Sequence, residues 1–193
     1  MKKIFVTPFF VLLFVSLCSG LDNNRKGFVL GVGAGLAPLS QFSSKAIKEN
    51  EPAQAGNFII GHGLDNRNIV AFEFNFTYRH SDYYSEIGRR TRRLFGTSPF
   101  HGSQTITQGF KGVTWYHYFN PLPKAPFTIV GVGFYNLTPK SLRATDSGFG
   151  FLIGGGHGLS RHIQIAGYYS HGQSNGGNLK HDQVSVLISY IAY

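Results

Sequence analysis

The segment from residue 69 to residue 80 alternates strictly between apolar and polar side chains. Its even-numbered residues include an apolar row, Val70, Phe72, Phe74, Phe76 and Tyr78. The odd-numbered residues between them are small, polar or charged, namely Ala71, Glu73, Asn75, Thr77 and Arg79. Alternation with period two is the mark of a β-strand whose two faces meet different surroundings. A soluble sandwich would turn the Phe row inward and a membrane barrel would turn it outward into lipid, so this strand alone leaves both folds open.

The connections between the predicted strands alternate in length along the chain. The predicted strands are 27–37, 56–64, 68–80, 104–119, 126–137, 147–158, 162–171 and 181–192. The first, third, fifth and seventh connections are long, whereas the second, fourth and sixth, 65–67, 120–125 and 159–161, are short. Short turns at one end and long loops at the other are typical of outer-membrane barrels. The sequence therefore predicts an all-β fold, an eight-stranded antiparallel up-and-down transmembrane β-barrel.

The main alternative is a soluble eight-stranded barrel of the lipocalin kind. Such a barrel needs inward apolar rows, and lipocalins usually carry a Gly-x-Trp near the first strand, which is missing here. Composition excludes other classes: the chain has 193 residues with 25 Gly, 18 Phe and 10 Tyr, and only 14% are charged. So many large apolar groups exclude a disordered tail, and so much Gly argues against a helical bundle. The single Cys cannot form a disulfide within the chain.

The first twenty residues have the three parts of a secretory signal peptide. A positive start, Met1-Lys2-Lys3, precedes an apolar run from Ile4 to Leu17 and three small residues, Cys18-Ser19-Gly20. The run is too short for a transmembrane helix, and Leu17 is too large for a lipoprotein signal. We therefore expect a signal peptide over 1–20 and a barrel domain over 21–193. Loss of two lysines would lower the net charge from +9 to +7, and export excludes nucleic acid as a partner.

The last predicted strand carries an apolar row and ends close to the terminus. The row is Val184, Val186, Ile188 and Tyr190. This pattern resembles the recognition signal of outer-membrane barrels, so we expect the outer-membrane assembly machinery as a partner. Aromatic residues near strand ends would suit an interfacial girdle: Tyr116, Tyr118, Phe119, Tyr168 and Tyr169.

Two segments, Gly27 to Gly35 and Gly148 to Gly156, show the alternation of glycine with aromatic and other apolar residues. With the strand pattern, they make the mature chain similar to the OmpA/OmpX-type superfamily of small eight-stranded outer-membrane proteins. The resemblance implies a bacterial outer-membrane location, and we expect a monomer. The interior of such a barrel is just wide enough for side chains. We expect Glu73 and Arg79 to face inward, and Lys111 too if Tyr116 and Tyr118 face outward. A charge network with Glu73 would fill the lumen, and an ion or proton pathway is the alternative.

The second long connection contains four arginines, Arg89, Arg90, Arg92 and Arg93. On an outer-membrane protein this loop would face the acidic lipopolysaccharide of the outer leaflet. Guanidinium groups pair bidentately with phosphates, so the cluster suits contact with lipopolysaccharide. A protein or glycan ligand and a merely solvated loop remain alternatives. The eight histidines show no tight ligand spacing, so we expect no metal and no cofactor.

The last hairpin brings a base, a hydroxyl and a carboxylate within twelve residues. His171 ends one predicted strand, Asp182 opens the next and Ser174 lies between them. Antiparallel pairing could place His171 beside Asp182 on an outward, apolar face. A serine becomes nucleophilic only with an adjacent base, which in turn needs an orienting acid. A simple turn rich in Gly, Asn and Ser is the alternative.

The run Ser174-Asn175-Gly176-Gly177 resembles the motif of the PagL-like lipid A 3-O-deacylases, which are also eight-stranded barrels. The resemblance implies Ser174 as nucleophile, His171 as base and Asp182 as orienting acid. The chain departs from the family motif in two ways. His171 precedes Ser174 by three residues rather than two, and the acidic residue, Asp182, comes earlier in the chain than it does in the family. Our first hypothesis is therefore a structural or binding protein of the envelope, and the second is an outer-membrane lipid A deacylase.

Overall fold

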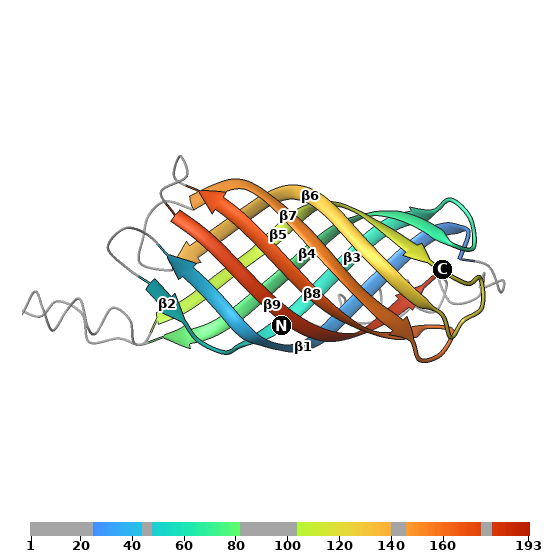
Figure 1. The fold of residues 1–193 in the computed structure, drawn as a ribbon, viewed down its shortest axis with the longest axis horizontal. Coiled ribbons are helices and arrows are strands. Elements are labelled where there is room, and N and C mark those ends of the chain that lie inside the picture. The colour runs from blue at the N-terminus through green and yellow to red at the C-terminus, as the bar shows by residue number, and fades with distance from the viewer. Residues whose placement is uncertain (1–24, 44–47, 82–103, 140–145, 175–178) are drawn as a thin grey trace, which may run out of the picture.

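Eight long antiparallel strands close into one barrel in the computed structural model (Figure 1). The structure describes residues 25–43, 48–81, 104–139, 146–174 and 179–193. The long strands are β1 (Gly27–Ser43), β3 (Ala53–Gly63), β4 (Asn68–Ser81), β5 (Gln104–Tyr118), β6 (Pro126–Pro139), β7 (Asp146–Gly158), β8 (Ile163–Ser174) and β9 (Leu179–Ala192). Each pairs with the next along the chain, and β1 also pairs with β9, which closes the barrel. The predicted eight-stranded antiparallel barrel is confirmed.

The first strand is longer than its sequence pattern indicated. β1 continues six residues past the predicted end at residue 37, and its pairing with β9 shifts register between Leu36 and Leu39. An irregularity of this kind absorbs an extra residue without ending the strand. A further short strand, β2 (Lys48–Asn50), pairs with residues 41–43 of β1, beyond the part of β1 that pairs with β3. Both features lie in what was predicted as the first long connection.

The predicted asymmetry of the two ends holds for two of the predicted long connections. Residues 64–67, 119–125 and 159–162 form short connections at one end (Figure 1), which we call the short-turn end. At the opposite end the connections 44–52, which includes β2, and 82–103 are longer. The connections 140–145 and 175–178 are no longer than 119–125, because the strands beside them extend further than predicted. Among the described residues no helix is long and apolar enough to cross a membrane.

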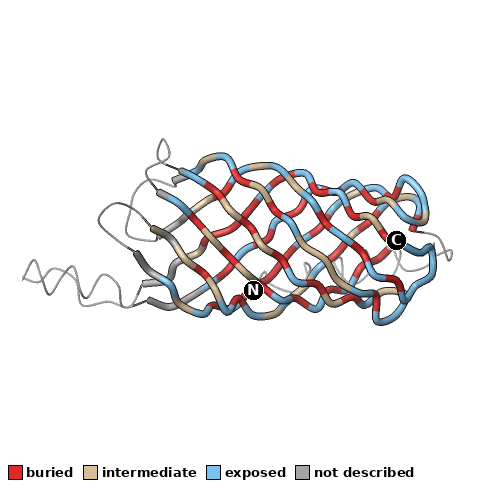
Figure 2. The backbone as a smooth tube through the Cα atoms, in the orientation of Figure 1, coloured by how far each residue is buried: buried red, intermediate tan, exposed pale blue. Residues whose placement is uncertain are grey.

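Buried and more exposed residues alternate along most of the length of the long strands (Figure 2). In β4 the apolar row faces outward, with Phe72 45% and Phe74 38% exposed, whereas Ala71 and Glu73 are buried. Val186 and Ile188 of β9 are likewise outward and exposed. The barrel thus turns its apolar rows away from its own interior, which contradicts the soluble lipocalin-like alternative and fits a wall surrounded by lipid.

The interior is filled by large side chains and a polar network. The Glu73 carboxylate accepts a hydrogen bond from Tyr116 Oη at 2.6 Å and another from Asn57 Nδ2 at 3.1 Å. Asn57 Nδ2 also lies 3.2 Å from Tyr168 Oη. The prediction that Glu73 faces inward is confirmed, and hydroxyl and amide donors solvate its buried carboxylate.

Two sequence-based expectations about β5 were wrong. Tyr116 and Tyr118 face the lumen, where both are almost wholly buried, and Lys111 faces outward. Side-chain direction in a strand follows residue parity, and the even-numbered residues of β5 point inward. There the Tyr116 hydroxyl donates to Glu73, whereas the odd-numbered Lys111 faces outward. Lys111 therefore does not join Glu73. Tyr168 is also inside the barrel, so the expected girdle keeps only Phe119 and Tyr169 on the outer side. The side chain of Arg79 lies outside the described part of the chain.

Candidate functional site on the outer wall

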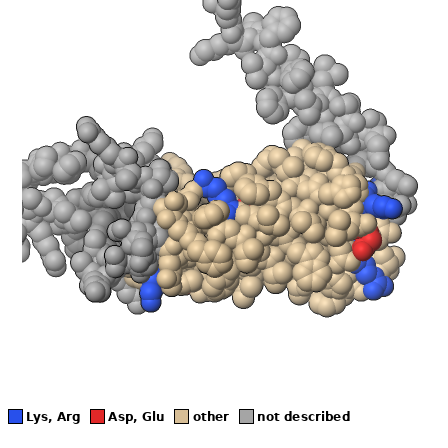
Figure 3. Space-filling view, turned by 90° about the horizontal axis from the view of Figure 1, so that it is seen from above, with Lys and Arg blue, Asp and Glu red and all other residues tan. Residues whose placement is uncertain are grey.

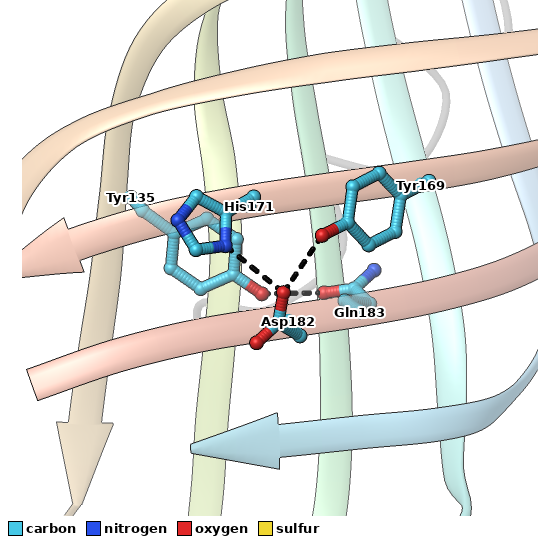
Figure 4. A network of polar contacts seen from close by, with 5 residues as sticks. All are labelled: Tyr135, Tyr169, His171, Asp182 and Gln183. Atoms are coloured by element: carbon cyan, nitrogen blue, oxygen red, sulfur yellow. Dashed lines mark hydrogen bonds and ion pairs between the residues drawn. The ribbon is translucent and has the colours of Figure 1, made fainter. Parts of the chain in front are cut away.

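Neighbouring strands β8 and β9 present a polar cluster on the outer wall near the ends of the long connections. His171 and Asp182 are directly opposite each other in the β8–β9 register. His171 Nδ1 lies 2.9 Å from Asp182 Oδ1, and Tyr169 Oη donates to the same oxygen at 2.8 Å (Figure 4). The His171 and Asp182 side chains are 24% and 27% exposed, so the pair is accessible from outside.

Aromatic rings surround the pair and keep the cluster on an otherwise apolar wall. The Phe151 ring on β7 lies 5.5 Å from the His171 ring and 6.1 Å from the Tyr169 ring, measured between centroids. Asp182 is ten residues from the end of β9 at Ala192. At about 3.3 Å per residue and a tilt of about 40°, that places it about 25 Å above the short-turn end, at the upper edge of an apolar band about 25 Å tall.

The geometry assigns complementary roles to the two side chains. A carboxylate at Nδ1 holds the proton on that nitrogen and fixes the ring, which leaves Nε2 as the basic atom. Tyr169 contributes a second donor to Asp182, which restricts the carboxylate further. The arrangement can therefore supply an oriented base or a hydrogen-bond acceptor to a molecule approaching from the side of the barrel.

A layer of lumen residues supports the cluster from behind. Gln183, the neighbour of Asp182, points inward and accepts from Tyr135 Oη at 3.0 Å (Figure 4). Its side-chain amide nitrogen, Nε2, donates to Asn75 Oδ1 at 3.0 Å. This buried network fixes the backbone of β9 where Asp182 projects outward. Sequence reasoning missed the inner layer and the contact of Tyr169 with Asp182. The signal for that contact was available, because Tyr169 and His171 are two residues apart and therefore share a face of the strand.

The remaining predicted site residues are placed only in part. The backbone of Ser174 lies at the end of β8, opposite Leu179, but its side chain is outside what the structure describes. Arg89, Arg90, Arg92 and Arg93 also lie outside the described residues. Within the described ranges, no group of three or more His, Cys, Asp or Glu side chains could hold a metal ion. The pairing of His171 with Asp182 is thus the part of the predicted triad that can be seen.

A closed barrel of eight strands, with an apolar outer wall and a polar interior, defines an integral β-barrel membrane protein. The chain belongs to the family of the outer membrane protein beta-barrel domain, whose sequence profile matches residues 9–191. It is therefore a protein of the bacterial outer membrane. In such barrels the short turns are periplasmic and the long loops extracellular. The cluster around His171 accordingly faces the outer leaflet.

Solved structures of small outer-membrane barrels are similar to this fold. One is Ail, the attachment invasion locus protein of Yersinia pestis, in complex with the heparin analogue sucrose octasulfate, at 12% identity and a TM-score of 0.56. That match covers 86% of this chain and 99% of Ail. Another is Neisserial surface protein A, at 12% identity and a TM-score of 0.54, covering 87% of this chain and 98% of that one. At this identity the likeness concerns the fold. No curated protein sequence matches the chain.

Proposed function

We propose that this barrel is a binding protein of the cell surface whose extracellular loops contact lipopolysaccharide and so support the integrity of the envelope. The observation that carries the proposal is the filled interior. Tyr116, Tyr118, Tyr135, Phe110 and Phe127 are almost wholly buried within the described lumen. An eight-stranded barrel packed in this way offers no wide path for solutes, so the surfaces left for a partner are the outer wall and the loops.

The charge of the second long loop favours an anionic partner. Its four arginines, Arg89, Arg90, Arg92 and Arg93, belong to the connection between β4 and β5. These two strands end on the side of the outer leaflet, whose lipopolysaccharide carries phosphates. Arginine binds such groups through two parallel hydrogen bonds. The structurally similar Ail was crystallised with a sulfated sugar, which makes a sulfated glycan a reasonable second probe for this loop.

A charge-matched comparison tests the proposal. Replacing all four loop arginines by glutamine should weaken lipopolysaccharide binding to the purified barrel by about tenfold or more, because several phosphate contacts are lost. The control replaces four basic residues at the periplasmic end, Lys26, Arg67, Lys124 and Arg161, by glutamine. It removes the same charge and should bind as the wild type does. Equal losses in both variants would show a general charge effect, and no loss in the loop variant would refute the proposal.

A second candidate function is removal of an acyl chain from lipid A, and the His171–Asp182 contact favours it. An imidazole held by a carboxylate at the level of the outer leaflet has two of the three groups that an esterase of this kind needs. Ser174 would be the nucleophile. Side chains two residues apart share a face of a regular strand and those three apart do not, so catalysis requires the chain to depart from regular strand geometry between His171 and Ser174.

Mass spectrometry of lipid A tests this second candidate directly. Cells that produce the wild-type protein should lose an ester-linked acyl chain from lipid A, whereas cells producing Ser174→Ala or Asp182→Asn should not. Gln173→Ala, at an exposed neighbouring position, is the matched control and should behave as the wild type does. Unchanged lipid A in cells with the wild-type protein would exclude the esterase.

A further inference from the structure

A lysine side chain, that of Lys111, lies on the lipid-facing wall within the apolar band. Lys111 is the middle residue of β5, and its exposed side chain lies on the same face as its register partners Phe74 and Phe134. Among the described residues the ion pair found is that of His171 with Asp182, so no described carboxylate neutralises Lys111. Figure 3 shows that one face of the wall between the two ends is almost free of charged side chains.

The depth of Lys111 makes this placement costly without a partner. The residue is seven positions from the periplasmic end of β5 at Tyr118. With a rise of about 3.3 Å per residue and a tilt of about 40°, its Cα lies about 18 Å from that end, inside an apolar band about 25 Å tall. A lipid-facing lysine destabilises a barrel at such a depth, and a charge within the membrane is therefore a candidate functional group.

The lysine side chain extends toward the outer leaflet. In the β5–β6 register Lys111 is opposite Phe134, and Asn136 lies two residues further toward the extracellular end. With the Asn136 amide oriented by its hydrogen bonds, Oδ1 accepts from Lys111 Nζ and Nδ2 donates to the backbone carbonyl of Tyr135. The ammonium group thus reaches up the wall, as basic side chains do near a membrane interface.

A groove in the wall begins at this ammonium group. It has a volume of about 450 Å³ and is lined by Lys111 and Asn136 together with the apolar side chains of Phe72, Val113, Val132 and Phe134. One part of the groove is therefore cationic and polar, and the rest is apolar. This combination matches an amphipathic molecule with an anionic head and a hydrocarbon chain.

We propose that this groove is a binding site for lipid A, in which Lys111 and Asn136 contact a phosphate and one acyl chain lies along Phe72, Val113, Val132 and Phe134. The occupant is lipid A because the polar part of the groove lies toward the outer leaflet, where lipid A is the phosphorylated lipid. The inference rests on the proposed partner, lipopolysaccharide, but concerns a site on the barrel wall and not the arginine loop.

Native mass spectrometry of the detergent-solubilised barrel with purified bisphosphorylated lipid A tests the site. Lys111→Met should lower the affinity about tenfold, the effect expected from losing one charge-assisted contact, and Lys111→Arg should retain most of it. Lys180→Met is the matched control, because it removes an exposed lysine from β9 on another part of the barrel. Its affinity should equal that of the wild type. Met is tolerated on a lipid-facing wall, and Trp115 fluorescence verifies folding of each variant.

The probes separate the possible outcomes. Wild-type affinity in Lys111→Met would refute the site, as would equally tight binding of dephosphorylated lipid A or of phosphatidylglycerol to the wild type. The variant lacking the four loop arginines should keep its Lys111-dependent binding of lipid A. If Lys111→Met loses lipid A while the loop variant binds lipopolysaccharide normally, the wall site stands and the loop proposal fails. The reverse pattern supports the loop and refutes the wall site.

Discussion

The guanidinium carbon of Arg25 lies 3.8 Å from the centre of the Tyr118 ring and covers the periplasmic end of the lumen. Arg25 is only 6% exposed. Its Nη1 donates to the carbonyl of Asn66 at 2.9 Å, and its Nη2 donates to that of Leu122 at 2.7 Å. One side chain thus joins the residues before β1 to two separate periplasmic turns. Tyr118 in turn donates to Gln164 Oε1 at 2.9 Å, which links this closure to the inner network.

Replacing Arg25 by alanine should destabilise the barrel by about 2–4 kcal/mol. The change removes charge-assisted hydrogen bonds and a partly desolvated cation–π contact, and it leaves the carbonyls of Asn66 and Leu122 without this donor. Urea unfolding in lipid vesicles, followed by Trp115 fluorescence, measures the effect. Lys26→Ala, at the exposed neighbouring residue, should change the stability by less than about 0.5 kcal/mol. Similar losses of stability in both variants would show that the contacts of Arg25 do not account for the destabilisation.

Glu73 should be the most sensitive polar residue of the lumen. Glu73→Ala deprives Tyr116 and Asn57 of a shared acceptor in a buried site, with an expected loss of about 2–4 kcal/mol. Glu73→Gln keeps one acceptor oxygen and the side-chain volume, so it should lose less. Tyr116→Phe measures the same contact from the other side. If Glu73→Ala is as stable as the wild type in urea unfolding, the network does not stabilise the fold.

Two glycines of β8 differ sharply in the space around them. A Cβ on Gly172 would clash with Tyr135 Cβ, which belongs to the rigid base of that side chain, whereas a Cβ on Gly167 would meet nothing within 4 Å. We expect Gly172→Ala to destabilise the barrel by about 1–3 kcal/mol through overpacking. Gly167→Ala should be neutral or slightly stabilising, since alanine restricts the unfolded chain. Heat-induced loss of the folded band on electrophoresis ranks the two variants, and equal midpoints would refute the argument.

Asp65 makes the first periplasmic turn sensitive to pH. The hydrogen bonds from the Asn68 side-chain amide, with those from the backbone N–H groups of Arg67 and Asn68, lower the pKa of the Asp65 carboxyl. Because the folded pKa lies below the unfolded value of about 3.9, the stabilisation is present above that value and is lost as pH falls through the folded pKa. Asp65→Asn should therefore be less stable than the wild type at neutral pH, and the two should converge in acid. A constant difference across a pH series of urea unfolding would contradict this.

The local pattern was sufficient to predict the strands but not their full extent. Alternation in β4 and β9 identified both strands and the two faces of each, because side-chain direction in a strand follows residue parity. Which face is the outer one was predicted from the lengths of the connections and not from the alternation. The end of β1 was predicted six residues too early, at residue 37. Its continuation to Ser43 depends on hydrogen bonds to β9, more than a hundred residues away in the chain.

The sequence by itself determined the number of barrel strands, which follows from short-range periodicity, and the predicted lengths of the connections then favoured an outward Phe row. It did not decide which face of β5 was the inner one, because Tyr116 and Val113 are both plausible toward lipid. In the folded barrel the Tyr116 hydroxyl donates to Glu73 inside the lumen, so Lys111, which has the opposite parity on β5, faces lipid. The contact of His171 with Asp182 likewise depends on the β8–β9 register, and a register is fixed only when strands pair within a closed barrel.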